Sequence, residues 1–396
     1  MSMERKVPNI RFKGFSGEWE NKKIGRILTE IKRPIELMDN TSYQLVTVKR
    51  RNEGVVPRAI LKGKNILVKN YFRVEAGDYL ISKRQVVHGA NGIVPDNLDG
   101  AVVSNEYLVV TDSDDITAKY WTIISIRPEM HKIFFVSSYG VDIEKLVFDV
   151  TDWKNRTIFI PQVTEQKNIT NYFQKLDALI NQHQQKHDKL SNIKKAMLEK
   201  MFPKPGETVP EIRFKGFSGE WEERGFSDIA TRISTHHQST LLPCVEYEDI
   251  VAGKGRLNKD IHQKKTFKAG LKFESDDVLF GKLRPYLKNW FLADFEGLAV
   301  GDFWVLRANN VASTFLFSLI QTNGFELISN LSAGSKMPRS DWGLVSSSCF
   351  FVPKNISESN EIGSYFQKLD ALINQHQQQI TKLNNIKQAC LSKMFV

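Results

Sequence analysis

The sequence has few cysteines and no long hydrophobic run, and these absences exclude several classes of protein. Only 3 of the 396 residues are cysteines (Cys244, Cys349 and Cys390), and none belongs to a CxxC pair. The sequence therefore indicates no disulfide framework, no structural zinc site and no redox pair. No run of about 18 apolar residues occurs, so we expect no transmembrane helix and no membrane partner. The N-terminal segment MSMERKVPNI lacks the apolar stretch of a signal peptide, and we expect a cytoplasmic protein.

Motifs of common catalytic sites are also absent from the sequence. There is no GxxxxGK[ST] loop for ATP, and no glycine-bearing cofactor loop with the Pro-Pro-aromatic motif of an adenine methyltransferase. VPDNLDG at 94–100 contains Pro-Asp, but no acidic-x-Lys follows at the spacing of a nuclease. HHQ at 236–238 lacks the neighbours that would make a zinc site or a general base. We therefore expect a non-catalytic chain with no cofactor or metal of its own.

The composition is that of a globular protein with a basic bias. Hydrophobic residues make up 41% and charged residues 25% of the chain, which argues against large disordered tracts. The length favours about two or three domains. Lysine and arginine total 55 against 45 acidic residues, a net charge of +10. Such a charge suits a phosphate-rich partner, although charge alone favours nucleic acid only weakly.

Two segments of the chain are duplicated almost letter for letter. YFQKLDALINQHQQ occurs at 172–185 and again at 365–378, and the longer segments 172–203 and 365–396 agree at 24 of 32 positions. VPNIRFKGFSGEWE at 7–20 returns as VPEIRFKGFSGEWE at 209–222. The segments between these repeats differ, so the sequence predicts a repeated framework around variable contents.

The repeated segment that begins YFQKLDALI is predicted to be a long helix. It is rich in Leu, Lys, Gln and Ala, which are good helix formers, and PKPGETVP at 203–210 follows its first copy as a linker. Apolar residues recur at intervals of three and four, the pattern of a heptad seam. The predicted seam consists of Phe173, Leu176, Ile180, His183 and Leu190 in the first copy and Phe366, Leu369, Ile373, His376 and Leu383 in the second. The two histidines are expected to set the register rather than to bind metal.

Two equal amphipathic helices in one chain can bury their apolar stripes against each other. We therefore expect an antiparallel coiled coil related by a pseudo-twofold axis, and the alternative is that each helix packs only on its own domain.

The segments 21–165 and 223–360 contain short β-branched and aromatic runs separated by turn residues. The predicted fold class is α+β: two similar mixed α/β domains separated by two long helices. The predicted parts are 1–165, the central helix 166–203, the second domain 204–360 with its linker 204–210, and the C-terminal helix 361–396.

Four sequence features together resemble the specificity (S) subunit of type I restriction–modification systems over essentially the whole chain. These are the paired IRFKGFSGEWE segments, the paired YFQKLDALI helices, FGKLRPYLKNW at 280–290, and AGSKMPRSDW at 333–342 leading to FFVP at 350–353. The first domain departs from this pattern, with SKRQV in place of GKLRP and YGVDIEKLVFDVTDW in place of AGSKMPRSDW.

The resemblance implies a DNA-recognition subunit that is not itself an enzyme. Each domain would be a target-recognition domain that reads one half of a bipartite site in double-stranded DNA. Two methyltransferase (M) subunits and restriction (R) subunits would be the protein partners, and S-adenosylmethionine, ATP and Mg would be bound by those partners. The duplicated helices and RFKGFSGEWE segments would provide two equivalent docking surfaces for the M subunits.

Basic and amide side chains in the variable segments are the candidate DNA contacts, because such groups reach base edges and phosphates. In the first domain these are Lys83, Arg84, Gln85, His88 and Asn91, with Lys49, Arg50 and Arg51 suited to phosphates. In the second domain they are Lys282, Arg284, Tyr286 and Lys288, supported by Lys254, Arg256, Ser335, Lys336 and Arg339. Each cluster has an alternative interpretation as an ordinary solvated surface. Trp19 and Trp221 lie in identical repeats and are expected to be structural.

Two other functions remain open on the sequence alone. One is a structural protein whose helices hold two domains for ligands other than DNA. The other is a stand-alone enzyme of unrecognised type. The salt dependence of DNA binding separates the first of these from the DNA-recognition hypothesis, because phosphate recognition weakens steeply as salt rises.

Overall fold

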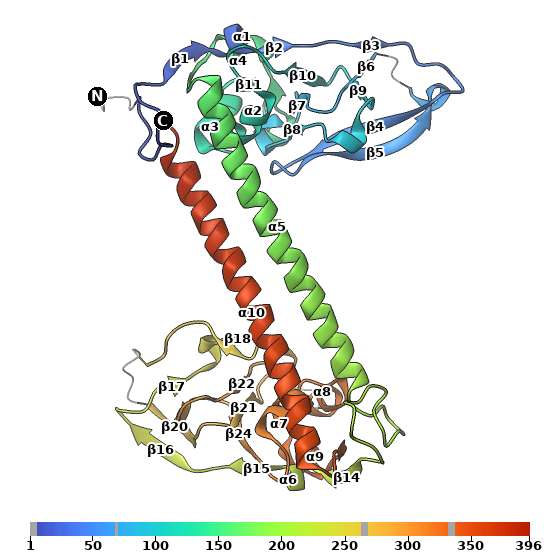
Figure 1. Cartoon of the computed structure of the whole chain (residues 1–396), viewed down its shortest axis with the longest axis vertical. Coiled ribbons are helices and arrows are strands. Elements are labelled where there is room, and N and C mark those ends of the chain that lie inside the picture. The colour runs from blue at the N-terminus through green and yellow to red at the C-terminus, as the bar shows by residue number, and fades with distance from the viewer. Residues whose placement is uncertain (1–5, 68–69, 263–267, 332–336) are drawn as a thin grey trace. The chain divides into compact units, whose positions relative to one another are not determined.

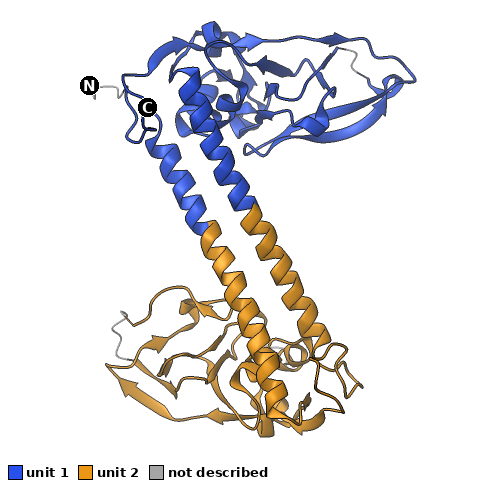
Figure 2. Ribbon diagram, in the orientation of Figure 1, with its two compact units in different colours: residues 1–181, 381–396 blue, residues 182–380 orange. Residues whose placement is uncertain are grey.

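The computed structural model describes residues 6–67, 70–262, 268–331 and 337–396, and it divides into two compact units. Unit 1 contains residues 1–181 and 381–396, and unit 2 contains residues 182–380 (Figure 2). Two of the predicted DNA contacts, Ser335 and Lys336, lie outside the described residues. The four-part division predicted from the sequence stays a prediction.

Unit 1 is built on two main sheets. One has the order β2 (Thr29–Glu30), β10 (Tyr107–Thr111), β7 (Tyr79–Ser82), β8 (Asn91–Ile93). The other has the order β3 (Pro34–Ile35), β6 (Tyr71–Arg73), β9 (Val102–Ser104), β4 (Ser42–Lys49), β5 (Gly54–Lys62). Two-stranded pairs join β1 (Glu20–Lys23) to β13 (Thr157–Ile160) and β11 (Ser138–Tyr139) to β12 (Val147–Phe148). The shorter helices are α1 (Ile24–Ile27), α2 (Ala118–Ser125), α3 (Pro128–Val136), α4 (Val150–Asn155), η1 (Gly63–Asn65), η2 (Val86–His88), η3 (Asp96–Leu98) and η4 (Ile143–Lys145).

Unit 2 repeats this plan with different sequences. Its first sheet has the order β15 (Ala230–Ile233), β24 (Phe303–Ala308), β21 (Val278–Gly281), β22 (Trp290–Leu292). The second has the order β16 (His236–Ser239), β20 (Lys268–Phe273), β23 (Gly297–Ala299), β17 (Cys244–Val245). Pairs join β14 (Glu222–Gly225) to β25 (Cys349–Val352) and β18 (Ile250–Val251) to β19 (Arg256–Leu257). Its shorter helices are α6 (Phe226–Ile229), α7 (Ser313–Leu319), α8 (Asn323–Ser329), α9 (Trp342–Ser347), η5 (Tyr247–Asp249) and η6 (Pro285–Leu287).

The first sheets of the two β-rich domains share one strand order, as the similar sequence patterns predicted, and within the described residues the second sheets share theirs except for β5, which has no counterpart in the second sheet of unit 2. In both units a central strand pairs antiparallel on each side, β7 with β10 and β8, and β21 with β24 and β22. Both second sheets also contain one parallel pair, β4 with β9 and β17 with β23. Strands β7 and β21 are buried along their whole length, which explains their continuous apolar sequences.

The acidic turn before each central strand has a structural role. Asp78 is 2% exposed, binds Arg33 through two hydrogen bonds and accepts the backbone N–H of Glu75. In unit 2, Asp277 is 1% exposed and binds Arg307 in the same way. Each carboxylate raises the pKa of its arginine above the usual value, chiefly through the hydrogen bonds between them. Each buried carboxylate is thus paired with a partly exposed arginine, which offsets the cost of burying its charge.

Two long helices, α5 (Val163–Lys200) and α10 (Ile356–Lys393), pack antiparallel, as predicted (Figure 1). In unit 1 Lys387 Nζ lies 2.5 Å from Asp177 Oδ1, and in unit 2 Lys194 Nζ lies 2.6 Å from Asp370 Oδ1. Both helices have the length to span a bilayer, but they are too polar, and the described part of the chain contains no helix that meets both requirements.

The predicted seam residues lie along these helices. Phe173 and Leu176 are buried in the core of unit 1, which Leu383 also contacts. Phe366, Leu369 and Ile373 are buried in unit 2, where Leu190 packs against the same core as Phe366 and Leu369. His183 and His376 meet with their Nδ1 atoms 2.9 Å apart, and Ile180 is exposed to an intermediate degree.

The C-terminal end of each long helix is buried in a domain that the helix does not follow in sequence. Met394 and Phe395, just after α10, are 4% exposed and lie in the core of unit 1 against Trp19 and Phe173. Met201 and Phe202, just after α5, occupy the matching place in unit 2. Phe202 packs there on Trp221 and Phe366. The alternative in which each helix packs only on its own domain is therefore wrong.

Trp19 and Trp221 are 4% and 2% exposed, which confirms that both are structural.

Candidate nucleic-acid interface

In unit 1 the predicted basic loop connects the buried strand β7 to β8. Lys83, Arg84 and Gln85 follow β7 directly, and η2 then carries the chain back to β8. The turn between β4 and β5 is hydrogen-bonded to this loop. Arg51 N–H donates to His88 O at 2.7 Å and Asn52 N–H donates to Gly89 O at 2.8 Å. The two basic clusters predicted separately from the sequence therefore form one surface.

The turn between β4 and β5 has an uncommon backbone. Arg51 has φ 61° and Asn52 has φ 56°, in the left-handed region that costs a residue with a side chain about 1 kcal/mol or more. The bonds to His88 and Gly89 hold the turn in this conformation. Strained backbone conformations persist where the surrounding structure holds them, and they are common at functional sites. The strain therefore favours a functional role for this turn.

Side chains from two other segments of unit 1 converge on Glu144. Arg50 donates to Gln85 Oε1 at 2.8 Å and to Glu144 Oε2 at 2.7 Å. His88 Nε2 lies 3.7 Å from Glu144 Oε1 and has no hydrogen-bond partner among the described residues. Glu144 thereby orients Arg50. It lies in η4, within the YGVDIEKLVFDVTDW segment, where no sequence pattern pointed to an acid.

The remaining predicted contacts of unit 1 differ in exposure. Arg84 is exposed and donates to Glu106 Oε2 at 2.8 Å, and Lys83 donates to Asn105 O at 2.7 Å. Lys49 is exposed at the end of β4. Asn91, by contrast, is 3% exposed within β8. Its burial disfavours the predicted contact with DNA, because its amide does not reach the surface.

In unit 2 the loop after β21 occupies the position of the loop after β7. Arg284 and Lys288 flank η6 with φ 50° and 58°. Two backbone hydrogen bonds stabilise the loop. Gly281 N–H donates to Asn289 O at 2.7 Å, and Arg284 N–H donates to Pro338 O at 2.8 Å. A side chain at position 281 would place its Cβ 2.8 Å from Asn289 O, so glycine is required there.

On one side of this loop, the basic side chains of Lys282 and Arg339 both lie close to Asp302. Its carboxylate lies 3.6 Å from Lys282 Nζ and 3.1 Å from Arg339 Nη2. The hydroxyl of Tyr247 donates to Asp302 O at 2.6 Å and accepts Leu283 N–H at 3.1 Å. Burial raises the pKa of Tyr247 to about 12, so the phenol stays protonated and keeps both bonds. The sequence did not single out Asp302 or Tyr247.

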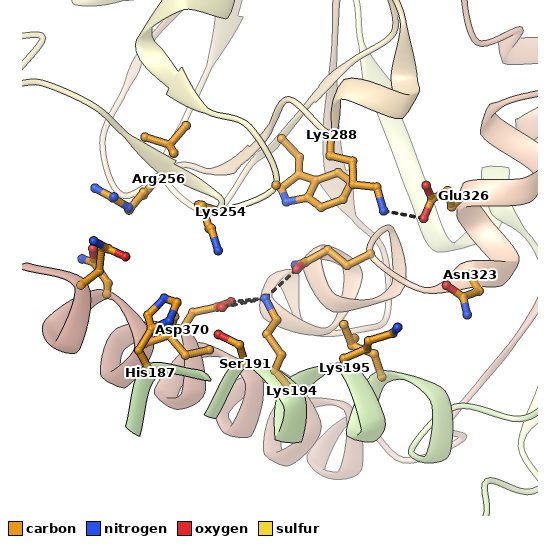
Figure 3. Close-up of a pocket in the computed structure, with 18 of the residues that line it drawn as sticks. His187, Ser191, Lys194, Lys195, Lys254, Arg256, Lys288, Asn323, Glu326 and Asp370 are labelled. Carbon is orange, nitrogen blue, oxygen red and sulfur yellow. Dashed lines mark hydrogen bonds and ion pairs between the residues drawn. The ribbon is translucent and has the colours of Figure 1, made fainter. Parts of the chain in front are cut away.

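The other predicted contacts of unit 2 form two further groups. Tyr286 is 52% exposed on η6. Lys254, Arg256 and Lys288 line a cavity bounded by α5 and α10 (Figure 3). Lys288 donates to Glu326 Oε2 at 2.7 Å. The hairpin β18–β19 that carries Lys254 is joined to the loop by a bond from Gly253 N–H to Lys288 O at 2.9 Å.

Both loops have the chemistry of a surface that contacts nucleic acid. They present guanidinium, ammonium, amide and phenol groups, which donate to base edges and phosphates. Most of these cations pair with one carboxylate each, and the ion pair fixes the orientation of the side chain. Among residues 6–67, 70–262, 268–331 and 337–396, no cluster of three or more His, Cys, Asp or Glu side chains could hold a metal ion.

The duplicated RFKGFSGEWE segments are anchored in the same way in both units. Arg11 binds both carboxylate oxygens of Glu165 in the first turn of α5, at 2.7 Å each. Arg213 binds Glu358 in the first turn of α10 at 2.6 and 2.7 Å. Beyond these anchors Lys13 and Lys215 are exposed, so the two segments present matching surfaces.

No protein-family model matches the chain. The specificity subunit of the type I restriction enzyme EcoDI of Escherichia coli is 23% identical over 207 residues, which are 49% of this chain and 46% of that subunit. The chain therefore spans about half the length of the curated relative that it matches.

Solved structures align with nearly the whole chain. The S subunit of a type I restriction–modification system from M. genitalium aligns with a TM-score of 0.57 at 13% identity, covering 98% of this chain and 99% of that one. The HsdS subunit from Thermoanaerobacter tengcongensis aligns with a TM-score of 0.44 at 15% identity, covering 95% and 96%. At such low identity, the match to the M. genitalium subunit establishes the fold.

Proposed function

We infer that this chain, which belongs to the specificity subunits of type I restriction–modification systems, recognises a bipartite DNA site with one half read by each unit. The observation that carries the proposal is a repeated scaffold with different loops. The strands before and after the loop have the same order in both units, whereas the loops 82–90 and 281–289 differ in sequence. Two similar scaffolds that carry different basic loops suit the recognition of two different half-site sequences.

Within each half-site we assign two kinds of contact. Arg50 and Gln85 in unit 1, and Lys282 and Arg339 in unit 2, are held in fixed directions and suit base edges. The more exposed Lys49 and Arg84 suit phosphates, which fix the register on the duplex without reading sequence.

We assign the duplicated surfaces to two M subunits. The RFKGFSGEWE segments and the helix residues 172–185 and 365–378 are identical in the two copies, as two copies of one partner require. Methylation with S-adenosylmethionine, and cleavage with ATP and Mg, would belong to the M and R subunits. Specificity subunits are generally non-catalytic, which agrees with a chain that positions DNA for its partners.

Measurement of DNA affinity as a function of salt tests the DNA-binding part of this proposal. We expect the logarithm of the binding constant of the full chain for duplex DNA to fall linearly with the logarithm of the salt concentration. Replacing Lys83 and Arg84 by alanine should reduce the magnitude of that slope by about 1 to 2. Lys354→Ala, an exposed lysine after β25, is the matched control and should leave the slope unchanged.

A chain that binds no duplex DNA at low salt would contradict the proposal. It would favour the alternative of a structural protein that carries domains for other ligands. Turnover of a substrate by the purified chain without partners would instead favour a stand-alone enzyme.

A further inference from the structure

Unit 2 contains a cavity of about 490 Å³, and three of the predicted DNA contacts, Lys254, Arg256 and Lys288, line it. One wall comes from the C-terminal half of α5 and from α10, and the other comes from the β18–β19 hairpin, β22 and α8 (Figure 3). Its volume falls within the range of small-molecule sites, about 300–1,000 Å³. Leu198, Val251 and Ile373 contribute apolar surface to the walls.

The lining has more positive than negative charge. Two of its cations are neutralised, because Lys194 binds Asp370 at 2.6 Å and Lys288 binds Glu326 at 2.7 Å. The other three, Lys195, Lys254 and Arg256, make no ion pair within the described part of the chain, and Glu199 is the one further carboxylate of the lining. Burial raises the pKa of Asp370, and the charges of Lys194 and Lys254 oppose that rise. A bound anion would balance the excess positive charge.

The lining also contains buried polar atoms that lack hydrogen-bond partners among the described residues. These atoms are Trp290 Nε1, Ser191 Oγ and Asn374 Oδ1. Trp290 is 6% exposed. Leaving a buried donor or acceptor unpaired costs about 1–3 kcal/mol, so three such atoms around one cavity indicate a ligand with several polar groups.

The duplicated helices differ where α5 faces this cavity. The α5 residues His187, Ser191, Lys195 and Glu199 line it at intervals of four, on one face of the helix. Their counterparts in α10 are Ile380, Asn384, Gln388 and Ser392. All four positions differ, although the two segments agree at 24 of 32 positions. The first helix copy therefore gives this face two charged side chains, Lys195 and Glu199, that the second copy lacks, whereas the lining residues Lys194 and Leu198 are identical to their counterparts Lys387 and Leu391.

We propose that this cavity binds a small phosphate ester of mononucleotide size. Lys254 and Arg256, from the β18–β19 side of the lining, hold the phosphate, since a guanidinium and an ammonium group match a dianion, whereas Lys195 lies at the other end of the lining (Figure 3). Ser191 and Trp290 bond to the polar groups of the rest of the ligand, which lies against the apolar walls. A cavity of about 490 Å³ has the size of a small-molecule site and cannot enclose a DNA duplex. The site does not depend on the DNA-recognition proposal.

Calorimetric titration of the full chain with AMP tests the assignment, with inorganic phosphate as a second probe. We expect one saturable site for AMP and weaker binding of phosphate alone. The combined variant His187→Ile, Ser191→Asn, Lys195→Gln and Glu199→Ser gives α5 the stripe of α10 and should weaken AMP binding about tenfold or more. The pair Lys254→Ala and Arg256→Ala should have a similar effect from the opposite wall.

The second helix copy provides the matched control. Asn384→Ser, Gln388→Lys and Ser392→Glu introduce the same residue types into α10 and should leave AMP affinity unchanged. Thermal unfolding of every variant verifies that the chain is folded.

Several results would overturn the site. They are no AMP binding at millimolar concentration, equal affinity in wild type and the α5 variant, and equal weakening by the α10 control. If the wild type binds no AMP while the α5 and hairpin variants bind duplex DNA more weakly, these residues belong to the DNA surface and the site proposed here is wrong. A failure to bind AMP leaves the DNA-recognition proposal intact.

Discussion

Arg11 and Glu165, 154 residues apart, form a two-bond ion pair in which each nitrogen–oxygen distance is 2.7 Å. The carboxylate is 1% exposed and lies in the first turn of α5, where the helix dipole also favours negative charge. Arg213 and Glu358 repeat the arrangement at the start of α10. The arginine of each duplicated RFKGFSGEWE segment thus anchors that segment to a long helix.

Removing either arginine should destabilise its unit strongly. Arg213→Ala leaves Glu358 buried without its cation, and we expect the free energy of unfolding to fall by about 3 kcal/mol. Urea unfolding followed by circular dichroism measures this loss. Lys215→Ala, which changes an exposed lysine of the same segment, should have an effect below about 0.5 kcal/mol. Equal effects of the two substitutions would contradict an anchoring role for Arg213.

The two ion pairs between the long helices should differ in strength. Lys194 and Asp370 have side chains 14% and 28% exposed, whereas Lys387 and Asp177 are 22% and 46% exposed. Lys194→Met leaves a carboxylate whose pKa burial already raises, and should cost about 2 kcal/mol. Lys387→Met should cost below about 1 kcal/mol, because water solvates Asp177. Thermal unfolding of the two variants makes the comparison, and a larger loss in Lys387→Met would contradict it.

The histidine pair of the helix seam should make stability depend on pH. Burial lowers the pKa of His376 below 6.5, and the charges of His183, Lys186 and His187 lower it further. The unfolded chain therefore binds the proton more readily than the folded chain. The stability contributed by the neutral imidazole is complete above the unfolded pKa and is lost as the pH falls through the lower folded pKa.

We expect the free energy of unfolding to decrease between pH 7.5 and pH 5.5 (about two units spanning the ordinary pKa of histidine). His376→Asn should make this decrease smaller, because asparagine does not titrate and is tolerated in helix seams. His236→Asn changes an exposed histidine of β16 and is the control. A pH dependence that is the same in wild type and His376→Asn would rule out this role for the pair.

Glu144 should control how Arg50 meets DNA. Glu144→Gln weakens the bond that holds the guanidinium and removes a carboxylate beside the proposed DNA surface. We expect tighter binding to non-specific duplex and a salt slope steeper by about 1. Glu129→Gln removes the same charge from α3, where Glu129 pairs with Arg127, and should change neither quantity. The same change of slope in both variants would show only an effect of net charge.

Sequence periodicity predicted the helices and the fold class because those depend on local pattern. The spacing of Phe173, Leu176 and their counterparts required a buried stripe, and the duplication supplied a second stripe to cover it. The acidic turn followed by an apolar run, which recurs at GDYLIS and DDVLFG, likewise predicted the two matching central strands. The family resemblance is also confirmed.

Contacts between distant segments could not be predicted in this way. Nothing in the sequence indicated that Phe395 fills the core beside Trp19, or that Glu144 and Asp302 orient the basic loops. Acidic partners in loops leave no periodic signal, because their distance from the cation depends on the fold. Asn91 was selected as a polar residue near a basic loop, but its place in β8 buries it.

The most direct test of the central claim is a map of DNA methylation. The chain is co-expressed with its cognate M subunit in a methylation-free host, and methylated adenines are located genome-wide by single-molecule sequencing. We predict one gapped motif with two different short halves, and replacement of residues 21–165 by the corresponding segment of another specificity subunit should change one half only. No methylation despite a stable complex, or a swap that alters both halves, would contradict the assignment of one half-site to each unit.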